Sequence, residues 1–298
     1  MIKIITHNAK FHTDDVFAVA TLLIALGKEN CKILRTRDES IIAQGDYVVD
    51  VGNVYDKEKN RFDHHQMGGA GERKNGIPYA SFGLVWKKFG KEVSGSVEIA
   101  EKIDYTIAQY VDALDNGQNI VSSQIPGSFP FTINSIIDQF RPTWKEEKNW
   151  DERFMEAVHL AQSVIKREIN ITADIFEGAK IVEKSYTESV DKKIIIVNEE
   201  YDFGRELVMN TLVKFVEPTY AILFRGDTQS WQVLAIRKSM ATFESRKALP
   251  EAWRTRRGIE FEKASNVSGA LFCHRSGFMC TAESKESAIK LAEIALNF

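Results

Sequence analysis

Short apolar segments alternate with longer helix-like segments along the first half of the chain, and this alternation most constrains the fold. The predicted strands cover residues 3–6, 31–35 and 46–51, and the predicted helices cover 15–27, 79–89 and 97–114. The first helix is rich in Ala and Leu and ends at Gly27, which is a common stop signal. Strands that alternate with helices predict an α/β layer built on a largely parallel sheet.

The second half of the chain shows a helical stretch followed by a new pattern of strands and helices. Residues 144–190 are rich in Glu, Lys and Ala, as in long exposed helices. The later pattern comprises strands at 193–197, 220–224 and 231–237 and helices at 204–216 and 284–297. We therefore expect a first domain over residues 1–150, a helical connection over 151–190, and a smaller α+β domain over 191–298.

Composition excludes several classes of protein. Hydrophobic residues make up 44% and charged residues 27% of the 298 residues, which predicts a packed soluble protein. The net charge of -3 provides no global positive field, so a nucleic-acid partner needs a local basic patch. Cys31, Cys273 and Cys280 are scattered, which argues against a thiolate zinc site or a disulfide scaffold. With no secretory signal and no long apolar run, we expect a cytoplasmic protein without a membrane partner.

Histidines and aspartates gather directly after the predicted strands. Four of the six histidines lie in two short segments. The candidate side chains are His7, His12, Asp14, Asp50, Asp63, His64 and His65. Because the carboxyl ends of parallel strands meet at one sheet edge, we expect these side chains to converge. Imidazole and carboxylate together suit Mn²⁺, Fe²⁺ or Zn²⁺, whereas Mg²⁺ favours oxygen ligands.

Each of these motifs alone has an ordinary structural explanation. Asp14 could be the N-cap of the following helix, and His64 with His65 could be a satisfied structural pair. Asp50 ends the apolar run Tyr-Val-Val, where an unpaired carboxylate is costly to bury but can bridge two cations. All of these motifs follow predicted strands. This common position favours one metal site over a different structural role for each motif.

These segments resemble the DHH phosphoesterase superfamily, named for the triplet found here as Asp63-His64-His65. The chain is most similar to the melanocyte-proliferating gene exonuclease family, whose opening motif is similar to residues 7–15. Ala9 replaces the usual Gly of that motif, and Asp15 replaces Glu. Further matching segments are residues 35–38, 48–52, 61–66, 111–117, 243–246 and 272–278, so the resemblance covers nearly the whole chain.

The resemblance implies a parallel-sheet DHH-type catalytic domain over residues 1–150 and a substrate-binding domain over 191–298. It implies that His7 and His12 hold one metal, and that Asp14 and His64 hold the other with a carboxylate from 112–115. It implies three catalytic residues: Asp50 would bridge the metals, His65 would face the phosphate, and Asp63 would orient its neighbours.

Asp112 and Asp115 are both candidates for the last ligand. They lie three positions apart, so both can share one helix face. We prefer Asp115, since it precedes the Asn116-Gly117 break, where a side chain can reach the sheet edge.

Basic residues in the second domain are candidates for substrate binding. Ser245, Arg246 and Lys247 offer a hydroxyl, a guanidinium fork and an ammonium group, which suits a phosphate. These three also resemble the phosphate clamp of the manganese pyrophosphatases. Arg254 lies in an arginine cluster near Trp253 that could hold a nucleic-acid backbone, or could be an exposed helix start.

A third candidate is the loop that contains His274, Ser276 and Gly277. It follows an apolar run, and the glycine could let the backbone approach a ligand closely.

The predicted function is a Mn²⁺-dependent phosphoester hydrolase that acts on RNA or a short oligonucleotide as a 3′–5′ exonuclease or oligonucleotidase. Two metals would activate the attacking water. Mg²⁺, Fe²⁺ and Zn²⁺ are alternatives to Mn²⁺. A pyrophosphatase-like or small-molecule phosphodiesterase is an alternative favoured by residues 245–247, and a non-catalytic metal-binding protein is another. The oligomeric state stays open, with a homodimer as one option.

Overall fold

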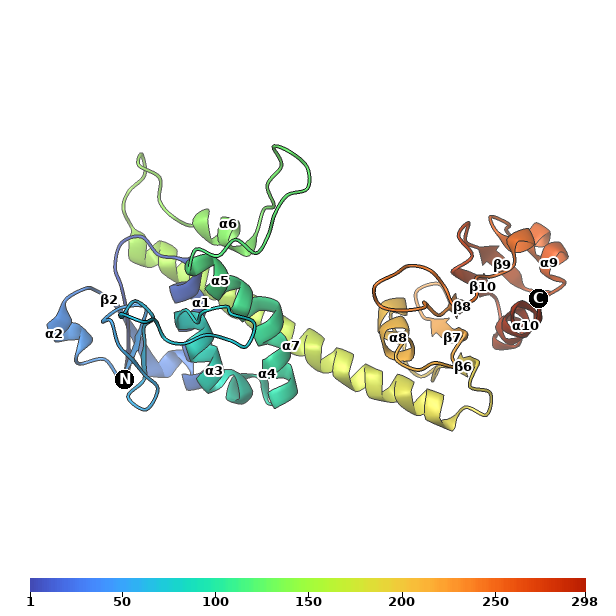
Figure 1. The fold of residues 1–298 in the computed structure, drawn as a ribbon, viewed down its shortest axis with the longest axis horizontal. Helices are drawn as coiled ribbons and strands as arrows, with labels where there is room; N and C mark the ends of the chain where they lie inside the picture. The colour runs from blue at the N-terminus through green and yellow to red at the C-terminus, as the bar shows by residue number, and fades with distance from the viewer. The chain divides into compact units, whose positions relative to one another are not determined.

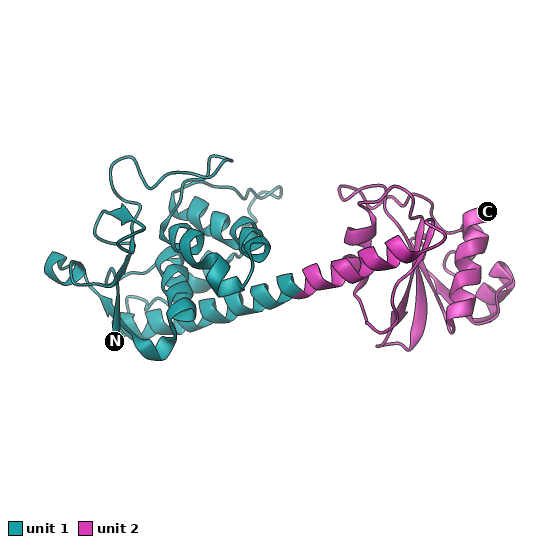
Figure 2. Ribbon diagram, turned by 90° about the horizontal axis from the view of Figure 1, so that it is seen from below, with its two compact units in different colours: residues 1–173 teal, residues 174–298 magenta.

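A computed structural model describes all residues from Met1 to Phe298. The chain forms two compact units, unit 1 from Met1 to Ala173 and unit 2 from Asp174 to Phe298 (Figure 2). The boundary falls inside the long helix α7 (Trp150–Glu188), which covers most of the expected helical connection. None of the helices combines the length and the apolar character that crossing a lipid bilayer requires.

Unit 1 contains a five-stranded sheet in the order β2-β1-β3-β5-β4. The strands are β1 (Ile2–Thr6), β2 (Cys31–Arg35), β3 (Tyr47–Val49), β4 (Tyr55–Asp56) and β5 (Arg61–Phe62). β1 pairs in parallel with β2 and β3, and β3 pairs in parallel with β5, while only β4 is antiparallel. The predicted α/β layer with a largely parallel sheet is therefore confirmed.

Helices around this sheet form most of unit 1 (Figure 1). They are α1 (Thr13–Leu26), η1 (Lys28–Asn30), α2 (Glu39–Ile42), α3 (Ser81–Ser94), α4 (Val97–Ile103), η2 (Asp104–Ala108), α5 (Gln109–Asp115) and α6 (Ile133–Asp138). α1 is apolar around most of its circumference and is buried over eleven residues, as expected for a core helix. It packs on α3, where the rings of Phe17 and Phe82 lie 5.2 Å apart. The helix expected over 97–114 is interrupted by the π-helical turn η2.

Unit 2 contains a second five-stranded sheet in the order β6-β7-β8-β10-β9. Its strands are β6 (Ile194–Ile196), β7 (Tyr220–Arg225), β8 (Ser230–Ala235), β9 (Ala270–Cys273) and β10 (Met279–Ala282). Only the pair β6 and β7 is parallel. The helices are α8 (Arg205–Leu212), η3 (Glu251–Trp253), α9 (Ile259–Ser265) and α10 (Lys285–Asn297).

Alternate residues of β7 pack into two cores on opposite faces of this sheet. Tyr220 and Ile222 lie with Leu291 of α10 on one face, and Leu223 lies with Leu212 of α8 on the other. This follows from the twofold period of side chains along a strand. The small α+β domain expected at the C-terminal end of the chain is thus a sheet covered on both faces.

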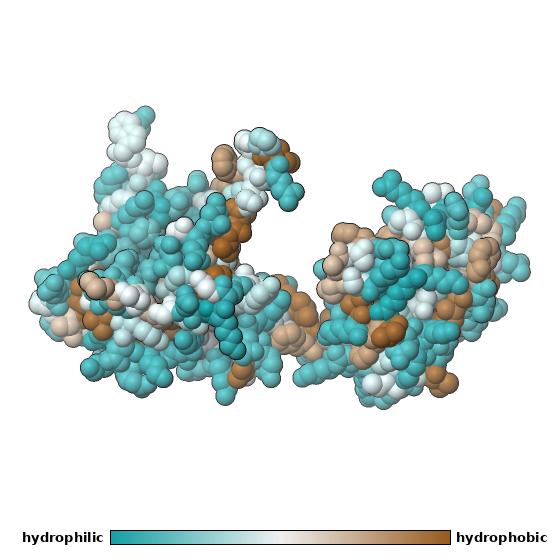
Figure 3. Space-filling view, viewed as in Figure 1, coloured by the Kyte–Doolittle hydropathy of each residue, from teal (hydrophilic) through white to brown (hydrophobic).

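The segment between α5 and α6 carries apolar side chains in solvent. Ile125, Phe129 and Phe131 are each exposed, Phe129 to 89%. In Figure 3 this segment shows apolar surface above a mostly hydrophilic face of unit 1. These side chains therefore contribute nothing to the core of unit 1.

Candidate metal centre

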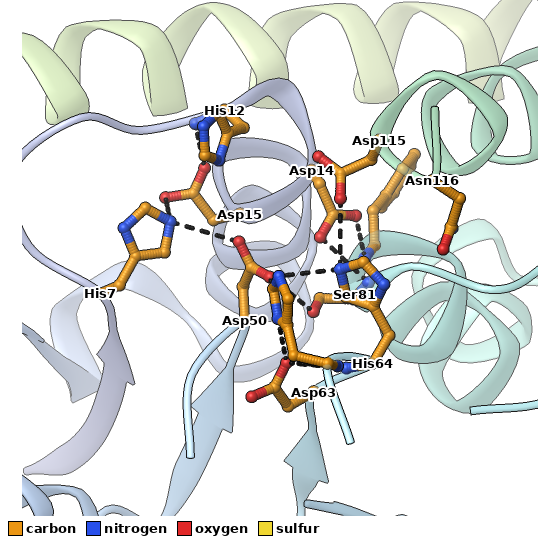
Figure 4. Close-up of polar contacts among 12 residues, drawn as sticks. His7, His12, Asp14, Asp15, Asp50, Asp63, His64, Ser81, Asp115 and Asn116 are labelled. Carbon is orange, nitrogen blue, oxygen red and sulfur yellow. Dashed lines mark hydrogen bonds and ion pairs between the residues drawn. The ribbon is translucent and has the colours of Figure 1, made fainter. Parts of the chain in front are cut away.

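The carboxyl ends of three parallel strands supply most of the candidate side chains. His7 follows β1, Asp50 follows β3, and residues 63–65 follow β5. Figure 4 shows His7, Asp50, Asp63 and His64 converging with Asp14 and His12 from the start of α1 and Asp115 from the end of α5. The parallel pairing of β1, β3 and β5 places these strand ends at one edge, which is why the residues meet there.

Asp50 lies at the centre of the group. Its Oδ2 lies 3.2 Å from Nε2 of His7, and its Oδ1 lies 3.5 Å from Nε2 of His64. Asp50 has a left-handed backbone with φ of +53°, which is uncommon for a residue other than glycine and which aspartate tolerates better than most. Such conformations cluster at functional sites because the surrounding structure must hold them in place.

One set of ligand atoms comes from His7, His12, Asp15 and Asp50. Their atoms all lie within 4.8 Å of one another. Asp15 was not predicted as a ligand, since the sequence offered only its place beside Asp14 in the first helical turn. Its Oδ1 accepts a hydrogen bond from the backbone N–H of His12, and its Oδ2 lies 3.3 Å from Nε2 of His7.

A second set comes from Asp14, His64 and Asp115, again within 4.8 Å of one another. Oδ2 of Asp115 lies 3.2 Å from Nε2 of His64. Asp50 with His64 and His65 forms a third set. Asp50 therefore belongs to two sets, one that contains His7 and one that contains His64. A carboxylate that bridges two cations would have this position.

The buried polar atoms of these sets fit divalent cations. Nε2 of His7, Oδ2 of Asp15 and Nε2 of His64 are buried without a hydrogen-bond partner. A buried polar atom without a partner costs about 1–3 kcal/mol, so such atoms in a native protein need a function or a ligand. Imidazole nitrogen with carboxylate oxygen is a donor set for Mn²⁺, Fe²⁺ or Zn²⁺.

The electrostatics of the centre also favour a positively charged ligand. Burial raises the pKa of Asp15 to about 7, and burial with the nearby carboxylates raises the pKa of Asp14 well above its usual value. Burial lowers the pKa of His64, but the nearby carboxylates of Asp115 and Asp50 outweigh it and raise that pKa to about 11. A cation relieves the same repulsion between carboxylates that a bound proton relieves.

Asp63 organises the turn that contains the two adjacent histidines. Its Oδ1 accepts hydrogen bonds from the backbone N–H groups of His64 and His65 and lies 2.7 Å from Nδ1 of His65. Its Oδ2 accepts a 2.6 Å hydrogen bond from the N–H of Asn53. The His65 side chain is 56% exposed and lines a cavity of about 1010 Å³. Asp63 thereby holds the His65 ring at the open side of the centre.

Asp112 does not join the ligands. Its Oδ2 lies 2.7 Å from a guanidinium nitrogen of Arg73, and its Oδ1 accepts a hydrogen bond from the N–H of Gly83. The structure therefore groups Asp115 with the other candidate ligands and leaves Asp112 outside that group, which favours the preferred choice of Asp115. The sequence could not separate the two, because Arg73 comes from a loop about 40 residues away.

Two arginines hold the backbone of the loop between His7 and His12. Arg35 of β2 donates a 2.7 Å hydrogen bond to the carbonyl of Ala9, which has a φ of +60°. Arg141 donates a 2.7 Å hydrogen bond to the carbonyl of Phe11. Both guanidiniums lie within 6 Å of the Phe11 ring centre, at 5.6 and 5.9 Å. Neither arginine was predicted to support the site, because their acceptors are backbone atoms.

The basic residues predicted to hold a phosphate are used inside unit 2. The Arg246 guanidinium donates to the carbonyls of Val213, Val216 and Pro218. Lys247 donates to the carbonyl of Leu296. The structure therefore bonds these two side chains to backbone carbonyls distant in sequence, and their role in a phosphate clamp stays a prediction.

Among the remaining predicted substrate residues, Arg254 and Gly277 contact other parts of unit 2, whereas Ser245 and Ser276 line a cavity. Arg254 donates to the carbonyl of Leu249, and a Cβ on Gly277 would lie 3.0 Å from that same oxygen. Gly277, with a φ of +68°, thus allows a close backbone contact within the protein, where a ligand contact was expected. Nδ1 of His274 lies 2.9 Å from Oγ of Ser276. Ser245 and Ser276 line a cavity of unit 2.

The comparison with known proteins gives one consistent result. Residues 3–296 match the family model MYG1_exonuc, described as an uncharacterised protein family (UPF0160). A MYG1 protein of Caenorhabditis elegans is 30% identical, over 98% of this chain and 94% of its own length. The MYG1 exonuclease of Rattus norvegicus is 28% identical, over 99% of this chain and 84% of its own length.

Two solved structures align over almost the whole chain. A pGpG-specific phosphodiesterase from Vibrio has 13% identity and a TM-score of 0.33, and covers 100% of both chains. RecJ from Thermus thermophilus has 13% identity and a TM-score of 0.31, over 99% of this chain and 50% of its own. The family model and the curated relatives confirm the family resemblance. This chain belongs to the MYG1 exonuclease family.

Proposed function

We propose that this protein is a Mn²⁺-dependent exonuclease or oligonucleotidase that hydrolyses RNA from its 3′ end. The observation that supports this most directly is the position of Asp50. Its carboxylate lies in one ligand set with His7, His12 and Asp15 and in another with His64 and His65. A shared carboxylate is the arrangement expected for a two-metal hydrolase.

The two cations would be held by separate ligands joined at Asp50. One would be held by His7, His12 and Asp15, and the other by Asp14, His64 and Asp115. When bound, the pair supplies positive charge at the phosphate and lowers the pKa of the attacking water. Asp63 holds the His65 ring at the cavity, where we assign it to contact the phosphoryl group.

The cavity at the centre favours a substrate larger than pyrophosphate. Its volume of about 1010 Å³ lies at the upper end of the roughly 300–1,000 Å³ of small-molecule sites. Arg37 and Lys59 line it and can contact further phosphates of a nucleic-acid chain. The pyrophosphatase-like alternative loses its main support, since Arg246 and Lys247 are bonded to backbone carbonyls. The names of the mammalian relatives also support nuclease activity.

Purified protein stripped of metal with EDTA, then supplied with Mn²⁺ and a 5′-labelled short RNA, tests the proposal. We expect a ladder of products shortened from the 3′ end, and no products from Asp50→Asn. Asp174→Asn is the matched control, because Asp174 is an exposed residue of α7 with the same charge. Hydrolysis of pyrophosphate without RNA cleavage would overturn the nuclease proposal, and full activity of Asp50→Asn would overturn the two-metal proposal.

A further inference from the structure

The segment between α5 and α6, residues 116–132, has both of its ends at the cavity of the metal centre. Leu114 and Asp115, which precede the segment in the chain, line this cavity, and so do Asn134 and Asp138, which follow it. Irregular segments of this length are uncommon inside a compact domain and are usually binding loops, linkers or disordered. A segment that starts and ends at one cavity of unit 1 links no domains, so a contact with the substrate of that cavity is the natural role to consider.

A tight turn and a proline restrict the backbone of the α5–α6 segment. The backbone N–H of Ser128 donates a 3.1 Å hydrogen bond to the carbonyl of Ile125, across Pro126 and Gly127. Gly127 has a φ of +79°, so these four residues have the pattern of a type II turn. Pro130 has a fixed φ and also restricts the residue before it. The segment is therefore partly pre-organised, which lowers the entropy cost of holding a ligand.

The side chains of this segment carry no charge. Residues 116–137 contain no Asp, Glu, Lys, Arg or His, whereas Ile125, Phe129 and Phe131 are all exposed. Phosphates and anionic lipid headgroups are recognised by cations, which the segment lacks. Without carboxylates, the segment also does not repel a polyanion that lies beside it. The ligand chemistry that fits is a flat, uncharged group that stacks on a phenyl ring.

The two phenylalanines lie close to the cavity along the chain. Phe131 is three residues before Asn134, so its Cα lies at most about 11 Å from the Cα of a cavity-lining residue. The cavity, with a volume of about 1010 Å³, has the size of a small-molecule site and can hold the end of an oligonucleotide but not its whole length. The nucleotides beyond that end must cross the rim of the cavity, where Phe129 and Phe131 are within reach.

We propose that the α5–α6 segment is a base-stacking loop for RNA. The rings of Phe129 and Phe131 stack on bases that lie outside the metal-centre cavity, while the cavity holds the end that is cut. Stacking tolerates any sequence because every base has a flat face. The loop therefore determines how tightly longer RNAs are bound, without selecting among sequences. The inference rests on the proposed function for the identity of the substrate, and it adds a contact in unit 1 separate from the metal ligands.

Fluorescence anisotropy with a labelled oligoadenylate of about ten nucleotides tests this inference, using the full chain in EDTA so that no RNA is cut. We expect Phe129→Ala and Phe131→Ala each to weaken binding by roughly fivefold or more, since base–aromatic stacking contributes at least that much per base. Phe131→Leu should weaken binding as well, whereas Phe131→Tyr should keep it, because stacking requires a ring. Phe298→Ala is the matched control, since Phe298 is also exposed and lies outside the segment.

The length of the RNA distinguishes stacking from a damaged fold. The dinucleotide pApA lies largely within the cavity, so wild type and both alanine variants should bind it with equal affinity. Thermal denaturation should give unchanged melting temperatures, because both rings are exposed. Absence of wild-type binding to the longer RNA overturns the inference, as does equal affinity of wild type and both alanine variants for it. Variants that change from dimer to monomer with unchanged RNA affinity would make the segment an interface between copies and would also overturn it.

These outcomes are separable from those of the hydrolysis assay. If the alanine variants lose affinity for the longer RNA but Mn²⁺-loaded wild-type protein cleaves none, the nuclease proposal fails while the stacking loop stands. If RNA is cleaved and the variants bind it normally, the reverse holds.

Discussion

The carboxylate of Asp14 accepts a 2.6 Å hydrogen bond from the backbone N–H of Phe82. It accepts a second one, of 3.0 Å, from the N–H of Ser81. Asp14 thus satisfies the first turn of α3, although it belongs to the first turn of α1. The same carboxylate lies in a ligand set with His64 and Asp115. One side chain therefore links the packing of two helices to the metal centre.

This double role predicts different results for two substitutions of Asp14. Asp14→Ala leaves two buried N–H donors without an acceptor, so the free energy of unfolding in EDTA should fall by about 1–3 kcal/mol. Asp14→Asn keeps one acceptor oxygen and should lose less stability.

Both variants should bind one Mn²⁺ per chain where the wild type binds two. Urea denaturation and elemental analysis measure the two effects. Equal stability of both variants would contradict the role at α3, and two bound ions in both would contradict the role as a ligand.

The two arginines that hold the loop of His7 and His12 should control metal affinity without contacting the metal. Arg141→Ala leaves the carbonyl of Phe11 without its hydrogen bond, and Arg35→Ala does the same to Ala9. Residues that support metal ligands typically contribute about 10- to 100-fold to affinity, so we expect Mn²⁺ affinity to fall by at least about tenfold.

Titration with Mn²⁺ measures the affinity of these arginine variants. Arg153→Ala provides the control, because Arg153 forms only an exposed ion pair with Glu156 on the same helix, and such pairs contribute about 0–1 kcal/mol. Wild-type affinity in both arginine variants would show that the loop keeps its conformation without them.

Gly83 should be intolerant of any side chain. A Cβ at this position would lie 1.8 Å from Oδ2 of Asp112, so Gly83→Ala must displace the ion pair with Arg73. Overpacking costs about 1–3 kcal/mol, and disruption of the buried ion pair adds to it. Gly204→Ala is the contrasting variant, since its Cβ meets nothing within 4 Å and its φ is −62°. We expect Gly204→Ala to leave stability unchanged or slightly raised. Equal melting temperatures for the two variants would refute the steric argument.

The metal centre was predictable where local sequence determines position. Residues directly after parallel strands meet at a sheet edge, so His7, Asp50 and His64 could be grouped from the strand pattern alone. Asp15 was missed, because the helix was expected to begin at residue 15, whereas α1 begins at Thr13 with His12 as its N-cap. Which side chains of a first helical turn face a neighbouring site depends on where the helix begins.

The roles of the arginines in unit 2 were harder to predict, because their partners lie far away in the sequence. Arg246 looked free in the sequence, yet it donates to carbonyls about 30 residues away. Arg205 and Arg237 drew no attention, since neither lies in a recognisable motif, yet both line the cavity of unit 2. A guanidinium has five donors, and no local pattern shows whether backbone or ligand will satisfy them.

Asp115 and Asp112 provide a matched pair of substitutions within α5. Asp115→Asn removes a ligand beside His64, so the stabilisation by Mn²⁺ should be lost while stability in EDTA changes little. Wild-type protein at a hundredfold excess of Mn²⁺ over the dissociation constant should gain about 2.7 kcal/mol. Asp112→Asn instead weakens the buried pair with Arg73, and removing one partner of such a pair costs about 3–5 kcal/mol. Asp104 remains beside Arg73, so the observed loss should lie at or below the lower end of that range.

Urea denaturation with and without Mn²⁺ separates the effects of these two substitutions. We expect Asp112→Asn to lower the free energy of unfolding but to keep the stabilisation by Mn²⁺. We expect Asp115→Asn to keep the free energy of unfolding in EDTA but to lose the stabilisation by Mn²⁺. Because both substitutions remove one negative charge from the same helix, a general electrostatic effect predicts the same result for both. A Mn²⁺ response that is lost in Asp112→Asn and kept in Asp115→Asn would reverse the assignment of the ligand.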